Sequence, residues 1–332
     1  MEIHTIKQFD QGSRGLWQSL SAHDRTCAGL AHEVRLVDYL LADGGLALLV
    51  TKDNRPVFRT LLAPITEGHS CLGFFAWDPA ASDSAALAGG RLVMQEIARL
   101  RPKAQHKIVA PMNGATWFRY RLRVDDHPHR FDWEPPHHPQ LYQLLKDLGF
   151  QLDTKYHSQA SSPLRRFLDD AEKDSLRTMA EGFVIHAIDA AFLDRKGLEL
   201  IFKLSSEAFA SNSYYRPISF AAFTTLYQSS GPNKASQAVV ALDPDGEAVG
   251  FTYTFLEPQV DALVFKTGAV SKTARGHGLS NAMARHIALN MIPSIPTHYI
   301  AALVKEGLNS ESYARHGQLL WEHRYELLSI GE

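Results

Sequence analysis

The chain has 332 residues, enough for two domains of ordinary size. Apolar residues make up 45% of it, which allows a full hydrophobic core, and the formal net charge is −2. This balance lacks the overall positive charge of a nucleic-acid-binding protein, so we expect no nucleic-acid partner. The two cysteines, Cys27 and Cys71, are too few for a disulfide framework and are expected to be reduced thiols.

No segment predicts export or insertion into a membrane. The N-terminus lacks the apolar stretch of a signal peptide. No uninterrupted apolar run approaches the roughly 18 residues that span a bilayer. The sequence therefore predicts a cytoplasmic protein without a membrane partner.

The first half of the chain predicts alternating strands and helices from its apolar periodicity and turn residues. In chain order we expect a strand at 2–7, a helix at 14–24, a hairpin of strands at 45–51 and 57–62, a strand at 71–77, a helix at 85–100, a strand at 106–112 and a helix at 139–148.

The second half repeats this order of elements. In chain order we expect a strand at 182–188, helices at 196–210 and 217–228, strands at 237–242, 248–256 and 262–270, a helix at 279–291, a strand at 298–304, a short helix at 309–316 and a strand at 324–330. Between the halves, residues 158–180 predict a boundary followed by an amphipathic linking helix. We therefore predict two domains, residues 1–160 and 181–332, joined by residues 161–180.

The segment from Val270 to Ser280 joins a predicted buried strand to a predicted helix. Gly276 and Gly278 permit a tight turn that exposes consecutive backbone N–H groups. At the N-terminus of a helix, such donors and the helix dipole favour an anion. Arg275 adds a positive charge. The segment predicts a diphosphate-binding loop, although a plain strand-to-helix turn would use the same glycines.

Two common nucleotide-binding motifs do not fit this segment. The phosphate-loop pattern Gly-x-x-x-x-Gly-Lys-Ser/Thr is absent, and the dinucleotide pattern Gly-x-Gly-x-x-Gly fails at Asn281. The pattern Arg275-x-x-Gly278-x-Ser280 instead resembles motif A of the GCN5-related N-acetyltransferases (GNAT), which is Arg/Gln-x-x-Gly-x-Gly/Ala. Val270 lies five residues before the arginine, where that family ends its fourth strand.

The order of the later elements extends the resemblance over residues 181–332. The family continues with a strand, an asparagine and a helix, and here the strand at 298–304 is followed by Asn309 and Tyr313. Two departures are visible. Ser280 replaces the usual glycine or alanine, but it is small and its hydroxyl can donate to a phosphate. Tyr313 follows Asn309 more closely than the tyrosine does in many members of the family.

The resemblance implies an α/β fold of two tandem GNAT-like domains, each a mixed, mostly antiparallel sheet with helices on both faces. It implies acetyl-coenzyme A as the acyl donor and no metal. The backbone at Ala269 and Val270 would hold the pantetheine, and the amides that follow would hold the diphosphate. The residues that the resemblance assigns to coenzyme A are Ala269, Val270, Arg275, Gly276, His277, Gly278, Leu279, Ser280 and Asn309.

In such a reaction an amine attacks the acyl carbon directly. The protein must deprotonate an ammonium, stabilise an oxyanion and protonate the leaving thiolate. The resemblance gives Tyr313 as the proton donor, with side-chain packing as its simpler interpretation. Glu257, Asp261 and Glu306 lie near predicted strand ends and are candidate bases acting through water. For each of the three, a solvated surface carboxylate is the simpler interpretation.

The first half resembles the same fold without motif A. Asp78 and Asp83 lie between its strand at 71–77 and its helix at 85–100, and no arginine offsets them. Like charges at close range disfavour a diphosphate there. We expect that the first half binds no coenzyme A, and that it either shapes the acceptor site or is structural.

Two other segments are less specific. His127, His129, His137 and His138 lie in a proline-rich segment whose spacing matches no standard zinc site, so we predict a surface loop and no metal. The residues from Tyr214 to Pro217 precede a helix where this fold often lines its acceptor site. Packing is the simpler interpretation for them.

The sequence thus predicts transfer of an acyl group, acetyl in the first instance, from coenzyme A to the amine of a small molecule or peptide. It defines neither the acceptor, the acyl chain length nor the oligomeric state. One alternative is a non-catalytic sensor or scaffold that keeps the fold and binds coenzyme A, which the lack of an unambiguous base favours. Another is an aminoacyl transferase that uses charged tRNA, but the overall charge gives no hint of a basic RNA-binding surface.

Overall fold

The computed structural model describes residues 1–20, 30–78, 82–100, 106–188, 195–229, 236–307 and 316–331. The first half contains β1 (Glu2–Ile6), α1 (Gln11–Ser19), α2 (Leu30–Ala42), β2 (Leu46–Lys52), β3 (Arg55–Thr66), β4 (His69–Trp77), α3 (Asp83–Leu100), β5 (Lys107–Ala110), β6 (Leu122–Arg123), α4 (Pro139–Asp147) and β7 (Gln151–Ser162). The second half contains α5 (Leu164–Asp170), α6 (Glu172–Ala180), β8 (Val184–Ile188), α7 (Arg195–Phe209), α8 (Phe220–Ser229), β9 (Ser236–Leu242), β10 (Ala248–Glu257), β11 (Ala262–Val270), α9 (Leu279–Asn290), β12 (His298–Lys305) and β13 (Gln318–Ile330).

The strands of the described chain form one continuous sheet. Their order is β1-β2-β3-β4-β5-β13-β7-β12-β11-β10-β9-β8, and β6 pairs with β13. The order is symmetric about its centre: β1 to β5, counted from one end, occupy the same places as β8 to β12, counted from the other. Only β4–β5 and β11–β12 are parallel among the described pairs. The expected tandem arrangement of mixed, mostly antiparallel sheets is confirmed, and the two sheets are joined edge to edge.

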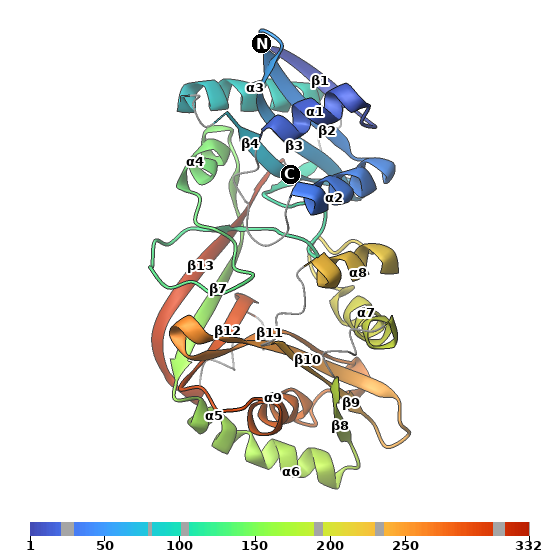
Figure 1. Cartoon of the computed structure of the whole chain (residues 1–332), viewed down its shortest axis with the longest axis vertical. Helices are drawn as coiled ribbons and strands as arrows, with labels where there is room; N and C mark the ends of the chain where they lie inside the picture. Colours follow the sequence, from blue (N-terminus) through green and yellow to red (C-terminus); the bar gives the residue numbers. More distant parts are fainter. Residues whose placement is uncertain are drawn as a thin grey trace.

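The junction consists of the last strand of each half. β7 and β13 pair antiparallel from Ser162 with Gln318 to Gln151 with Ser329, and Figure 1 shows them side by side between the two halves. The other edge of β7 pairs with β12 of the second half, and the other edge of β13 pairs with β5 of the first half. Each half therefore contributes its last strand to the sheet of the other.

The sequence did not predict β7, and the boundary expected at residue 160 lies inside this strand. The segment is rich in polar and small residues, which have weak strand propensity. Its polar side chains are tolerated because the neighbouring strands supply partners: Ser158 is fully buried, and its Oγ accepts a hydrogen bond of 2.8 Å from the backbone N–H of Leu303. The strand is therefore stabilised by residues far away in the sequence.

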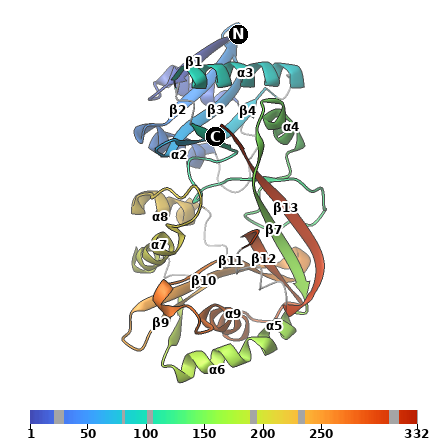
Figure 2. The same cartoon turned by 180° about the vertical axis from the view of Figure 1, so that it is seen from behind.

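Helices cover both faces of each half of the sheet. In the first half α3 and α4 pack on one face, and α1 and α2 pack on the other. In the second half α5 and α9 pack on one face, and α7 and α8 pack on the other. Figures 1 and 2 show α2 and α8 close together where the halves meet. The core beneath α7 and α8 includes Phe118 and Phe131 of the first half, so the halves share a hydrophobic core.

The elements around the predicted motif match the sequence closely. The strand predicted at 262–270 is β11, and the helix predicted at 279–291 is α9, which ends one residue earlier. The fourfold spacing places Leu279, Met283 and Ile287 on one face of α9, where they are buried against β9 and β10.

Other expectations differ from the structure. Helix α2 was not predicted, and the single linking helix is two helices, α5 and α6, that meet at Ala171. The last strand begins at Gln318, because its first residues pair with β7, which the sequence did not predict. The helix predicted at 14–24 corresponds to α1, which ends at Ser19. Residues 21–24 of the prediction lie outside the described residues. Residues 309–315 of the short helix predicted at 309–316 also lie outside them.

Two further features bear on the sequence expectations. No helix within the described ranges has both the length and the apolar character needed to cross a membrane. Cys71 is a buried free thiol in β4, and burial raises the pKa of this thiol to about 12. Cys27 lies outside the described residues.

We expect the second half to need β7 in order to fold. A fragment of residues 151–332 keeps β7 between β12 and β13, whereas a fragment of residues 164–332 differs only by the loss of this strand. Removing it exposes the hydrogen-bonding edges of both neighbours. Circular dichroism should show cooperative thermal unfolding for the longer fragment and none for the shorter one. Equal melting temperatures would contradict this role of β7.

Candidate functional site

Strands β11 and β12 run side by side at their beginnings and then separate. Their pairing ends where Phe265 lies beside Ala301. Beyond this point, among the described strands, residues 266–270 have only β10 as a neighbour and residues 302–305 have only β7. We call these two segments the strand split. Their facing edges leave backbone groups available to an extended ligand.

A β-bulge in each strand marks the split. In β11 the pairing with β10 skips Lys266. In β12, Ala302 and Leu303 together oppose the single residue Ser158 of β7, and Leu303 has a φ of 57°. Bulges end regular pairing and turn side chains away from the regular alternation. Both bulges therefore account for the separation of the strands at the same level.

Lys266 is a residue of the split that the sequence analysis did not select. Its ammonium lies 5.4 Å from the ring centre of Trp133, which belongs to the first half. Part of the side chain remains exposed, but desolvation of the ammonium and the nearby charge of Arg121 lower the pKa of Lys266 to about 8. A single charged residue in an otherwise uncharged strand was the signal that identifies this position.

Arg121 brings a second cation from the first half to the same place. Its guanidinium lies over the rings of both Tyr120 and Tyr156, 4.0 and 4.4 Å from their centres. Its Nη1 donates a hydrogen bond of 3.1 Å to the carbonyl of Leu303. The residue is 8% exposed, and its Nε has no hydrogen-bond partner in the described chain. Arg121 therefore connects the first half directly to the bulge in β12.

The segment after β11 forms the expected loop. A short 3₁₀ turn, Lys272–Ala274, leads to Gly276 and Gly278, whose φ values are 89° and 79°, and α9 follows. Glycine adopts this left-handed conformation without the strain of a side chain. Within the described chain, the backbone N–H groups of residues 276–281 donate to no acceptor. They are available to an anion at the N-terminus of α9.

Side chains of both charges surround this loop. Arg275 is exposed beside it. Nδ1 of His277 lies 2.5 Å from a carboxylate oxygen of Glu181, and a Cβ added to Gly278 would lie 2.7 Å from Asp174. The sequence did not predict these two carboxylates, which come from α6 and its end. The side of the loop toward Arg275 is therefore the side suited to an anion.

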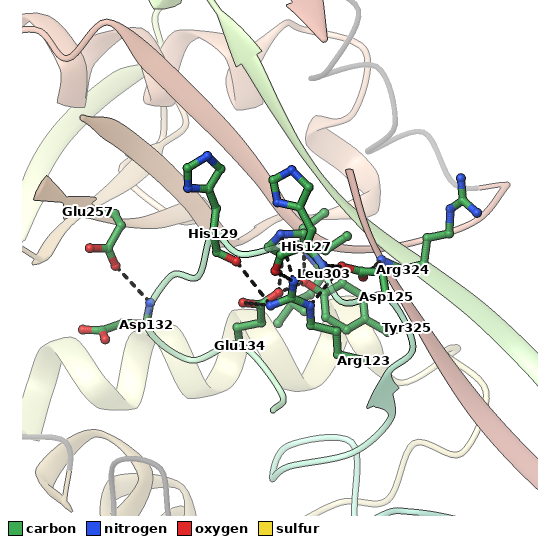
Figure 3. A network of polar contacts seen from close by, with 12 residues as sticks. Arg123, Asp125, His127, His129, Asp132, Glu134, Glu257, Leu303, Arg324 and Tyr325 are labelled. Atoms are coloured by element: carbon green, nitrogen blue, oxygen red, sulfur yellow. Dashed lines mark hydrogen bonds and ion pairs between the residues drawn. The ribbon is translucent and has the colours of Figure 1, made fainter. Parts of the chain in front are cut away.

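Two of the three carboxylates predicted as bases, Asp261 and Glu257, lie away from the split. Asp261 has a φ of 44° and accepts a hydrogen bond of 3.0 Å from the N–H of Thr297 where β11 begins, and its bonds with Thr297 lower the pKa of Asp261. Glu257 is 7% exposed and accepts a hydrogen bond of 3.1 Å from the N–H of Asp132 (Figure 3). Desolvation raises the pKa of Glu257. The register places Glu257 four residues along β11 from Lys266, roughly 13 Å away.

Three residues that the sequence assigned to acyl transfer follow β12. Glu306 is exposed just after the strand, and its backbone N–H donates to the carbonyl of Lys155. Asn309 and Tyr313 lie outside the described residues, so their assigned roles stay predictions.

The matching place between β4 and β5 of the first half is filled by the chain itself. The backbone N–H of Met112 donates to the carbonyl of Leu72 at 2.8 Å, which keeps the strands together. Oδ1 of Asn113 accepts a hydrogen bond of 2.8 Å from the N–H of Phe74. A Cβ on Gly73 would overlap the carbonyl oxygen of Met112. The backbone donor in this position is therefore already used.

The acidic connection of the first half has the expected position. Asp78 directly follows β4, and Asp83 is the first residue of α3; residues 79–81 between them lie outside the described chain. Negative charge therefore lies near the start of α3 with no arginine beside it in the sequence, whereas Arg275 lies near the start of α9 together with the carboxylates of Asp174 and Glu181.

A chain of buried hydrogen bonds runs from the split into the junction of the halves (Figure 3). The N–H of Leu303 donates to Oγ of Ser158, and the hydroxyls of Ser158 and Tyr325 are 3.0 Å apart. The hydroxyl of Tyr325 donates to Glu134 at 2.6 Å. The bulge in β12 is therefore fixed by residues of β7, β13 and the loop after β6.

Glu134 anchors the histidine-rich loop in the interior. Its carboxylate contacts Nη1 of Arg123 at 3.3 Å and also contacts His323. His138 caps α4 by accepting a hydrogen bond of 3.2 Å from the N–H of Leu141. The expectation of a surface loop is therefore wrong for part of this segment, because buried ionic partners hold it. No cluster of three or more potential metal ligands occurs in the part of the chain that the structure describes.

Comparison with known proteins identifies the fold. No protein-family model and no curated protein matches the sequence. A tandem GNAT protein from the clavulanic acid biosynthesis pathway has a TM-score of 0.55 and 13% identity, over 99% of this chain and 98% of that one. A conserved protein of Enterococcus faecalis V583, a probable N-acyltransferase, has a TM-score of 0.59 and 11% identity, over 99% and 72%.

A third similar structure is the glucosamine N-acetyltransferase region of a fungal β-N-acetylglucosaminidase. It has a TM-score of 0.52 and 13% identity, and the match covers 99% of this chain and 38% of that one. At such low identity these similarities establish the fold alone.

We expect Lys266→Met to stabilise the folded protein at pH 7, by about 2 kcal/mol, because it removes a desolvated ammonium. The pKa of Lys266 is lowered to about 8 from 10.5, so between these values the unfolded native sequence binds more protons than the folded one. The free energy of unfolding of the native protein should therefore increase as the pH rises through this range.

Urea unfolding at several pH values measures both effects. The variant Lys52→Met, which changes an exposed lysine at the end of β2, serves as the control and should behave like the native protein. The same pH dependence in native protein and Lys266→Met would contradict the desolvation of this ammonium.

Proposed function

We propose that this chain, whose fold is that of the tandem GNAT proteins, is an acyl-coenzyme A dependent N-acyltransferase. The acyl group is acetyl in the simplest case, and the acceptor is the amine of a small molecule or peptide. The observation that carries the proposal is the strand split of the second half together with the loop of free N–H groups that follows β11.

The donor would bind along β11 and the loop. The backbone at Gly268 is exposed. Together with the strand edge at Ala269 and Val270, it would bind the pantetheine as the edge of a sheet binds an added strand. The amides from Arg275 to Ser280 would hold the diphosphate at the N-terminus of α9. The free backbone N–H groups of the loop and the guanidinium of Arg275 complement the negative charge of the diphosphate. Asn309 is assigned to binding of the acyl donor by the family resemblance alone.

The chemistry needs a base and an acid that reach the split directly or through water. The amine nitrogen bonds to the acyl carbon, the carbon–sulfur bond breaks, the base takes the ammonium proton and the thiolate receives a proton. We assign the base role to Glu257, acting through water, because its raised pKa suits proton acceptance. Asp261, with its lowered pKa and its hydrogen bond at the start of β11, is better suited to holding the strand ends. Tyr313 is the proposed acid.

The distance of Glu257 from the split favours one alternative. A protein that binds coenzyme A as a sensor or scaffold would need the loop and the split but no base near them. Release of coenzyme A thiol from acetyl-coenzyme A in the presence of a panel of amines separates the two functions, because a sensor would bind the donor without releasing thiol.

We expect acetyl-coenzyme A to raise the melting temperature of the full chain. A ligand at 100 times its dissociation constant stabilises the folded state by about 2.7 kcal/mol. Arg275→Glu should abolish the shift because it places a negative charge beside the diphosphate, whereas Arg55→Glu, at an exposed position of the first half, should leave the shift intact. No shift with the native protein at millimolar ligand would overturn acyl-coenzyme A binding.

We expect Glu257→Gln to lower kcat for an identified acceptor by roughly a factor of 100, the contribution of general-base catalysis. Its affinity for acetyl-coenzyme A should not change, because the residue lies away from the loop. Glu306→Gln is the matched control and should keep its rate. If the control lost its rate and Glu257→Gln did not, the base would lie after β12.

A further inference from the structure

We propose that Lys266 and Arg121 together bind a carboxylate group carried by one of the two reactants. This inference rests on the proposed function and deepens it by naming a substrate class. The carboxylate belongs either to the acceptor, as in an amino acid, or to the transferred acyl group, as in a dicarboxylic acyl thioester.

The two cations lie on the two sides of the split. Lys266 is the bulged residue of β11, and Arg121 donates to the carbonyl of Leu303, the bulged residue of β12. Both therefore stand where the strands separate and where the reacting groups would meet. Their charges are close enough that Arg121 contributes to the lowered pKa of Lys266.

Neither cation has an anionic partner in the described chain. The buried carboxylates nearby are engaged elsewhere: Asp153 pairs with Lys107 at 2.6 Å, and Glu134 pairs with Arg123. The ammonium of Lys266 lies over the ring of Trp133, and the guanidinium of Arg121 lies over two tyrosine rings and donates to one carbonyl. Two desolvated like charges destabilise the free protein, and a bound anion would remove that repulsion.

The arrangement suits a carboxylate on a short carbon chain. The buried Nε–H group of Arg121 donates no hydrogen bond in the described chain. A guanidinium binds carboxylates through such N–H groups in pairs. The rings of Trp133 and Tyr120 beside the cations provide apolar surface for the attached carbons. The diphosphate is not this anion, because α9 packs on the opposite face of the sheet from Trp133.

The first test compares two donors by calorimetric titration of the full chain. If the acyl group carries the carboxylate, succinyl-coenzyme A should bind at least tenfold more tightly than acetyl-coenzyme A. Lys266→Met should remove this preference, and Lys266→Arg should restore part of it. Lys203→Met, at an exposed position of α7 on the same face of the sheet, is the matched control and should keep the preference.

The second test addresses the acceptor. The common L-amino acids and their α-amides are compared by the thermal shift that they produce in protein saturated with coenzyme A. If the acceptor carries the carboxylate, at least one acid should shift the melting temperature while its amide does not, and Lys266→Met should abolish the difference.

The two tests together decide the proposal. A preference for the carboxylate in either test, lost in Lys266→Met and kept in Lys203→Met, supports it and identifies the source. No preference in both tests, or a preference that survives Lys266→Met, overturns it while leaving acyl-coenzyme A binding intact. Failure of the proposed function would differ, because neither thioester would then bind at all.

Discussion

The antiparallel pairing of β7 with β13 is the interaction on which the rest of the structure depends. Each strand is the last element of one half and completes the sheet of the other, so neither half has a finished sheet without its partner. The exchange converts two similar folding units into one continuous sheet with a shared core.

The exchange makes the site of the second half a product of both halves. Ser158 of β7 holds the bulge at Leu303, and Arg121 of the first half holds the same residue from its carbonyl side. The corresponding place in the first half is filled by the chain itself, because Oδ1 of Asn113 accepts a hydrogen bond from the backbone N–H of Phe74. The second copy of the fold thus has a split between β11 and β12, whereas the corresponding backbone donor of the first copy is already used.

The sequence predicted the parts of the site that depend on local chemistry. The strand at 262–270 and the glycine loop after it follow from apolar runs, turn residues and helix-start signals that lie together in the chain. It did not predict β7, whose polar residues form a strand only because distant strands supply their partners. It did not select Lys266 and Arg121, because their proximity arises only when the two halves meet.

The central claim is that the two copies of the fold have different roles, and that the second alone binds acyl-coenzyme A. Calorimetric titration of the full chain with coenzyme A counts the sites directly. The account predicts one molecule per chain, because Asn113 and the acidic connection close the first half while the loop of α9 stays available. A stoichiometry near two would contradict it and would show that the matching place between β4 and β5 of the first half also binds a ligand.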